Sequence, residues 1–211
     1  MCKLSTACRA VDSTNPDLSK FTPAPFSALP TRRLGLSVGK SEIPFPNVQP
    51  NQATTLSRFM RRELRSLRLE LAAYSDESLI WLLPPALPNS GGTLTLHLTG
   101  NLRHYVGTIL GGGSFVRNRD AEFSLRDIPR AELLHQIAEA EGVVGSVLPR
   151  LRDAQLALPF PEAIRERQLT TGELLIQLAV HLSYHLGQIS YHRRLVTGNR
   201  TGVGALAAAD L

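Results

Sequence analysis

The chain has 211 residues, 43% of them hydrophobic, and a net charge of +5 at neutral pH. This length is enough for one domain with a substantial core. No apolar run approaches the ~20 residues that cross a bilayer, and no apolar segment follows the N-terminus as in a secretory signal. Both cysteines lie within the first eight residues, which excludes a disulfide framework. We therefore expect a cytoplasmic protein without membrane contact.

The positive charge is concentrated at the start of the chain. Residues 1–50 hold six Lys or Arg against three Asp or Glu, so the remainder lacks the basic face of a nucleic-acid-binding domain. The same fifty residues contain seven of the fourteen prolines and show no sustained periodicity. The sequence predicts a disordered or mobile extension over residues 1–50 and no nucleic-acid partner.

Helical periodicity begins at Gln52 and continues to about Tyr74, with apolar residues recurring at spacings of three and four. Several arginines accompany this segment, and we favour a solvated helix flank over an anion site for them. Residues 75–91 form a connector rich in Pro and Gly. Trp81, which lies within it, is expected to pack over the end of the core.

A second helix is predicted from about Thr93 to Leu110, where three glycines follow. It carries two neighbouring stripes. One stripe is apolar, and the other is polar at its centre and consists of Leu94, His97, Asn101, His104 and Thr108. Solvent-facing stripes favour Lys and Glu, so His and Asn at these positions indicate an interior cavity.

The connection over residues 111–129 is long for a compact helical protein. It can span the ~30 Å length of a bundle, so the third helix can run parallel to the second. For four of the charged residues in this connection, two interpretations stay open: they lie over a cavity mouth, or they belong to a solvated crossover loop. These residues are Arg117, Arg119, Asp120 and Glu122.

The third helix is predicted to begin after Asp127 as N-cap, with Pro129 in its first turn, and to end at Pro149. His135 stands alone on it and is interpreted as a surface or ordinary core histidine. Residues 152–169 form a second connector, which contains two prolines.

The last helix is predicted from Thr170 or Thr171 to about Val196, between a Thr-x-x-Glu capping box and Gly198. Its central stripe has spacings of four and three, typical of a bundle seam, and histidines occupy positions that leucine would normally take. The stripe is Leu174, Leu178, His181, His185, Gln188 and His192. Residues 199–211 are predicted to be a poorly ordered tail.

Four amphipathic helices over residues 51–198, two with inward polar stripes, predict an all-α four-helix bundle, and bundles build metal sites from facing helices. His181 and His185 lie one turn apart on one face and can bind one divalent metal. His97 is the natural third ligand. His104 and His192 compete for that role, but each lies seven residues, ~10.5 Å, beyond a proposed ligand.

We therefore interpret His104 and His192 as cavity-lining or second-layer groups. Asn101 and Gln188 are expected to orient a ligand or bind substrate, since metal-bound histidines donate their other N–H to a partner. The alternative is a structural bundle, dimeric in solution, whose histidines are satisfied by hydrogen bonds. Unpaired polar groups in a seam cost ~1–3 kcal/mol each, and for this reason we favour metal binding.

The segments Gly92–Leu102 and His181–Gln188 resemble the matching motifs of the DinB/YfiT-like superfamily of metal-binding four-helix bundles. The resemblance implies an up-down-down-up bundle with His97, His181 and His185 as metal ligands. Its members include thiol-dependent transferases that use low-molecular-weight thiols, a related isomerase and many proteins of unknown activity. A zincin-type glutamate base is absent, because Leu182 follows His181.

We expect a divalent metal, zinc first with nickel or iron as alternatives, on these three histidines. An open position would bind a thiolate or water and lower its pKa. Transfer of a low-molecular-weight thiol to an electrophile is the favoured reaction. Hydrolysis and a non-catalytic stress-response or ligand-binding role are the alternatives. No catalytic side chain is assigned, although five side chains are weak candidates for substrate contacts: Tyr105, Tyr184, Tyr191, Arg103 and Arg194.

Overall fold

The computed structural model of the chain describes residues 51–203. The predicted extension over residues 1–50 and the end of the predicted tail, residues 204–211, lie outside the described residues. The described part is all-helical, as predicted, and contains isolated β-bridges but no strand. None of its helices is long and apolar enough to span a membrane.

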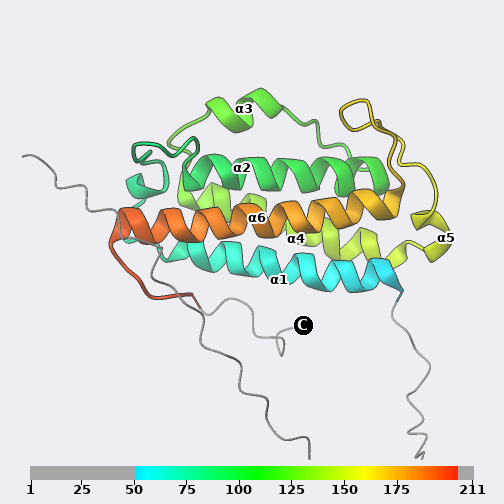
Figure 1. Cartoon of the computed structure of the whole chain (residues 1–211), viewed down its shortest axis with the longest axis horizontal. Helices are drawn as coiled ribbons and strands as arrows, with labels where there is room; N and C mark the ends of the chain where they lie inside the picture. Colours follow the sequence, from blue (N-terminus) through cyan, green and yellow to red (C-terminus); the bar gives the residue numbers. More distant parts are fainter. Residues whose placement is uncertain (1–50, 204–211) are drawn as a thin grey trace, which may run out of the picture. The chain divides into compact units, whose positions relative to one another are not determined.

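Four helices of at least twelve residues make up most of this region (Figure 1). Helix α1 packs against α4 and α6, and α2 packs against the same two helices and against α3. The elements in chain order are α1 Gln52–Ala72, η2 Ser78–Ile80, α2 Gly91–Leu102, η3 Arg103–Leu110, α3 Arg119–Ser124, α4 Arg130–Val147, η4 Leu148–Arg150, α5 Asp153–Leu156 and α6 Thr171–Thr197.

Side-chain caps fix the starts of three long helices. The Asn51 side chain accepts the Thr54 N–H at the start of α1, and Ser90 accepts the Thr93 N–H at the start of α2. Helix α6 begins with the predicted capping box, in which Thr170 and Glu173 satisfy each other's backbone N–H groups. These local hydrogen bonds explain why the first and last helices begin where the sequence predicts.

The start of the third long helix differs from the prediction. Asp127 is not its N-cap, because it adopts a left-handed conformation with φ 56°. The helix α4 begins at Arg130 after Pro129, which has no side chain that can cap it. The Glu77 carboxylate, from the connector before α2, accepts the Arg130 N–H instead. A cap supplied from fifty-three residues away leaves no local signal in the sequence.

The second predicted helix is one continuous rod with two kinds of hydrogen bonding. After α2 the chain forms the π-helix η3, and the Gly111 N–H binds the Val106 carbonyl five residues earlier at 3.0 Å. The wider turn changes which side chains share a face after Arg103. The predicted stripe, drawn at 3.6 residues per turn, therefore does not continue unchanged to His104.

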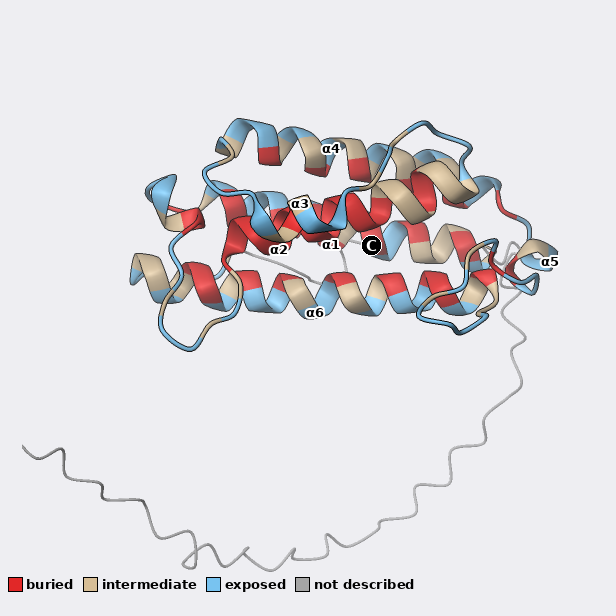
Figure 2. Cartoon of the chain, turned by 90° about the horizontal axis from the view of Figure 1, so that it is seen from above, coloured by how far each residue is buried: buried red, intermediate tan, exposed pale blue. Residues whose placement is uncertain are grey.

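Helix α2 lies between α3, α4 and α6, and all twelve of its residues are buried (Figure 2). The short helix α3 covers the side that α4 and α6 leave open (Figure 1). Thr95 and Thr99 donate to carbonyl groups one turn earlier, at 2.8 and 3.0 Å, so their buried hydroxyls are satisfied. Trp81 packs on the core, as predicted, and is only 8% exposed.

The first residues after α6 are fixed by hydrogen bonds to Arg193. Arg193 is fully buried, pairs with Glu70 of α1, and donates to the carbonyl groups of Asn199 and Thr201. The predicted tail from residue 199 is therefore anchored through Thr201. A buried guanidinium has five N–H donors to satisfy, and the returning backbone supplies acceptors for them.

Candidate metal centre

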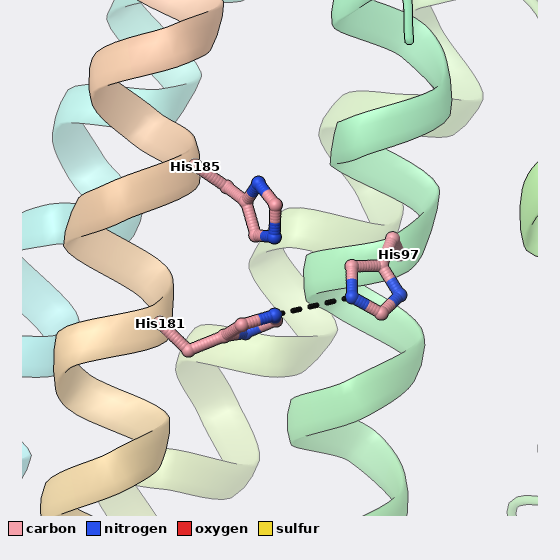
Figure 3. Close-up of side chains that lie close together, drawn as sticks. All are labelled: His97, His181 and His185. Carbon is pink, nitrogen blue, oxygen red and sulfur yellow. Dashed lines mark hydrogen bonds between the residues drawn. The ribbon is translucent and has the colours of Figure 1, made fainter. Parts of the chain in front are cut away.

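Three histidines from two helices meet in the space between α2 and α6. His97 comes from the middle of α2, and His181 and His185 lie one turn apart on α6 (Figure 3). Each offers one ring nitrogen, and these three atoms all lie within 4.8 Å of one another. The Nε2 atoms of His97 and His181 are 3.2 Å apart. The structure thus brings together the three predicted ligand residues.

This spacing suits a small divalent ion. Zinc binds imidazole nitrogen at ~2.0–2.1 Å in tetrahedral geometry, which places neighbouring nitrogens about 3.3 Å apart. The His97–His181 nitrogen pair already has about that separation, and none of the three ligand atoms lies more than 4.8 Å from another. The three imidazoles could therefore hold a metal ion.

The charge state of the triad also favours metal binding. Burial, helped by the neighbouring His185 and His97, lowers the pKa of His181 to about 4. Burial also lowers the pKa of His185, although its hydrogen bond to Gln188 opposes this. Both rings are consequently neutral near pH 7, and neutral imidazole is the form that binds metals.

A carboxylate holds the far side of the His97 ring. Glu122 of α3 is 6% exposed, and its Oε2 lies 2.9 Å from His97 Nδ1. Arg117 donates two hydrogen bonds to the same carboxylate, Nε to Oε1 at 2.7 Å and Nη2 to Oε2 at 2.8 Å. Burial alone would raise the pKa of Glu122, but the hydrogen bonds and charges of Arg117 and His97 lower it. An ionised Glu122 accepts the Nδ1–H of His97 and leaves Nε2 free for a ligand.

Close approach of α3 to α2 makes this contact possible. A Cβ atom at position 100 would collide with the Glu122 carboxylate, so any larger residue there would have to displace that side chain. His185 has a comparable support on α6, where its Nδ1 donates to Gln188 Oε1 at 2.6 Å. The sequence predicts that Gln188 orients a ligand or binds substrate, and in the structure its side chain contacts the His185 ring.

The remaining predicted residues separate into different environments. Asn101 is buried beside the triad and lines a cavity with His97 and His181. His104 lies outside that cavity lining, with its Nε2 3.2 Å from a carboxylate oxygen of Glu162.

His192 belongs to a separate cluster at the other end of α6. Its two ring nitrogens lie 2.7 Å from the Tyr74 hydroxyl and 2.7 Å from the Leu82 carbonyl, and it borders a separate apolar pocket. His135, predicted as a surface or ordinary core residue, is exposed on α4.

Arg117 and Glu122 are the functional residues that the sequence left undecided. Both lie in the long connection between the second and third long helices, one on each side of the start of α3. Arg117 lines the cavity beside the triad, and Glu122 is buried against His97, so neither residue belongs to a solvated loop. The sequence holds one weak signal for this contact, which is a glycine inside α2 where another element can approach closely. It does not indicate which loop residue makes the approach, because loop residues show no periodicity.

The comparisons with known proteins identify a family but not an activity. A family model described as a protein of unknown function, DUF1572, matches residues 53–204. The chain belongs to the DUF1572 family. No curated protein and no solved structure matches it. The matched region of this DUF1572 protein includes all three histidines of the triad.

The side chains that the sequence suggests as substrate contacts lie in different places in this DUF1572 protein. Tyr105 lines the cavity beside the triad. Tyr184 and Tyr191 are 63% and 75% exposed on the outer face of α6. Arg103 pairs with Glu139 at 3.2 Å. Arg194 lies over the Tyr191 ring. Of the five candidates, only Tyr105 lines the cavity that also contains His97 and His181.

Proposed function

We propose that this DUF1572 protein is a cytoplasmic, metal-dependent transferase that adds a low-molecular-weight thiol to an electrophile. The observation that carries the proposal is the convergence of three imidazole nitrogens within 4.8 Å, each from a ring on α2 or α6. Three His ligands leave a fourth tetrahedral position open, which is the pattern of catalytic rather than structural zinc sites.

The fold proposed with it is the up-down-down-up bundle of the DinB-like proteins. In Figure 1 the sequence colours of α2 and α4 advance in the same direction, opposite to those of α1 and α6. The contacts of α1 and α2 with both α4 and α6 agree with a four-helix arrangement. The long connection that carries α3 returns the chain to the starting end, as this course requires.

The proposed chemistry follows from the open position. A divalent metal held by His97, His181 and His185, zinc in the first instance, would lower the pKa of a bound thiol and so favour its thiolate near neutral pH. The thiolate sulfur forms a bond to an electrophilic carbon, the bond to the leaving group breaks, and the leaving group departs with the electron pair. The thiol proton passes to solvent. The same open position would activate water in a hydrolase.

Metal content tests the site first. Purified protein should contain close to one equivalent of a divalent metal, and His181→Ala should lose most of it. His135→Ala removes an exposed histidine from α4 and should leave the metal content unchanged. Circular dichroism checks that both variants are folded. A folded His181→Ala variant with the same metal content as the wild-type protein would contradict the assignment of the metal site.

Activity tests the reaction. Metal-loaded protein is incubated with cysteine or glutathione and 1-chloro-2,4-dinitrobenzene, and the thioether product is measured against the uncatalysed rate. We expect acceleration that chelation and His181→Ala abolish and that His135→Ala retains. Ester hydrolysis without thiol consumption would favour the hydrolase. A metal whose coordination positions are all filled, with no exchangeable solvent or thiol ligand, would favour the non-catalytic role.

A further inference from the structure

A cavity of about 830 Å³ adjoins the histidine triad and is rich in arginine. His97 and His181 form part of its wall, and the loop between α5 and α6 forms another part. The lining includes four arginines and neither Asp nor Glu. The arginines are Arg117, Arg119, Arg165 and Arg167. A cavity with this lining attracts anions and disfavours cations.

Three of these arginines are available to a ligand. Arg117 forms an ion pair with Glu122 and is therefore not free to bind a ligand in the same way. Among the described residues, no ion pair involves Arg119, Arg165 or Arg167, although Arg119 lies over the Phe123 ring. Guanidinium groups bind carboxylate and phosphate oxygens in pairs, and so they suit an anionic ligand.

Two of the available arginines are held by an ordered turn. Ile164 and Arg167 exchange backbone hydrogen bonds at 2.9 and 3.0 Å around a two-residue turn. The residues of that turn, Arg165 and Glu166, have φ values of 46° and 67°, a conformation that non-glycine residues seldom adopt. Strained turns of this kind concentrate at binding sites. This turn places two guanidinium-bearing residues at the cavity.

A buried polar atom in the cavity wall also lacks a partner. Asn101 is 8% exposed, and its Oδ1 forms no hydrogen bond within the described part of the chain. Buried amide groups are nearly always hydrogen-bonded, so this unpaired acceptor beside the cavity indicates a missing hydrogen-bond donor, from water or from a hydroxyl or thiol group elsewhere on a ligand. Glu162, the acid next to this lining, already pairs with His104 at 3.2 Å.

We propose that this cavity binds the carboxylate or phosphate group of a small organic anion, whose reactive end then faces His97 and His181. The assignment of the reactive end rests on the proposed function above. The binding of the anion does not, because it depends on the arginines and the cavity. The substrate class is therefore a thiol or an electrophile that carries negative charge.

Calorimetry on the zinc-loaded full chain tests the anion site. The probes are succinate, glycerol 3-phosphate and the neutral 1,4-butanediol. We expect at least one anion to bind, with affinity that falls as salt is raised, and no binding of the diol. The stronger of succinate and glycerol 3-phosphate identifies the preferred anionic group.

Paired substitutions locate the site. Arg165→Ala with Arg167→Ala should weaken anion binding at least tenfold, and Arg119→Ala alone should weaken it several-fold. Arg58→Ala with Arg68→Ala removes the same charge from exposed positions on α1 and should have little effect. Equal weakening by both pairs, or binding of neither anion, would overturn the proposal.

A second measurement separates this proposal from the proposed function. Cobalt-loaded protein is titrated with mercaptosuccinate and with the neutral 3-mercapto-1-propanol, and the thiolate-to-cobalt charge-transfer band is recorded. We expect mercaptosuccinate to give the band at a concentration at least tenfold lower. Equal concentrations would overturn the anion site and leave thiol binding intact. Anion binding without any band would retain the anion site and contradict thiol activation.

Discussion

At the scale of single residues, neighbouring side chains orient two of the three rings of the triad. His97 is held through Nδ1 by Glu122, and His185 is held through Nδ1 by Gln188. Each contact fixes the ring orientation and leaves Nε2 as the atom available to a ligand. Arg117 in turn keeps the Glu122 carboxylate ionised and in place.

Replacement of Glu122 by Gln should weaken metal binding about 10–100-fold, the usual effect of removing a carboxylate that supports a ligating histidine. The substitution keeps the size of the side chain but removes the negative charge of the carboxylate that accepts the hydrogen bond from His97 Nδ1–H. Competition with a chromophoric chelator measures the affinity.

Asp120→Asn is the matched control for this substitution. It removes an exposed carboxylate from the same first turn of α3 and should leave the affinity unchanged. Equal affinity in wild-type protein and the Glu122→Gln variant would remove Glu122 from the site.

At the scale of elements, one glycine determines how closely α3 approaches α2. Gly100 faces the Glu122 carboxylate with no room for a Cβ atom. Gly187, on α6, has open space around its Cβ position. The two glycines therefore differ in what a single methyl group would do, although both lie inside helices.

Gly100→Ala should destabilise the protein by about 1–3 kcal/mol through overpacking, and should also weaken metal binding as Glu122 is displaced. Gly187→Ala should be neutral or stabilise by up to about 1 kcal/mol, because alanine favours helix and meets nothing. Urea denaturation measures both free energies of unfolding. A Gly100→Ala variant as stable as wild type would show that α3 does not pack as described.

At the scale of the whole molecule, the histidines couple folding to pH. In the metal-free protein the pKa of His181 is about 4, whereas an unfolded histidine has a pKa of about 6.5. Between these values the unfolded chain binds more protons than the folded protein. The free energy of unfolding therefore decreases as the pH falls from about 6.5 to about 4, and this contribution stops changing below the folded pKa.

Chelator-treated protein should accordingly lose stability over this interval, and His181→Leu should reduce the loss. Denaturant midpoints at a series of pH values measure it. His135→Leu is the control, since that ring is exposed and its removal should leave the pH dependence unchanged. An equally steep decrease in the His181→Leu variant would show that other groups cause it.

The sequence by itself determined the elements whose signals are local. Caps at Thr170 and Gly198 place α6, and the four-residue spacing puts His181 and His185 on one face of it. His97 was identified from a polar stripe on a helix that otherwise reads as core. These predictions succeeded because helical periodicity and capping depend on residues only a few positions apart.

The tertiary structure alone decided what long-range packing controls. It set Glu122 and Arg117 against His97, and it turned Arg165 and Arg167 toward the same cavity. It also took His192 and His104 to other partners. Loop residues carry no periodicity, and a π-helix shifts the register within a helix, so their positions follow from how the helices pack rather than from their neighbours in sequence.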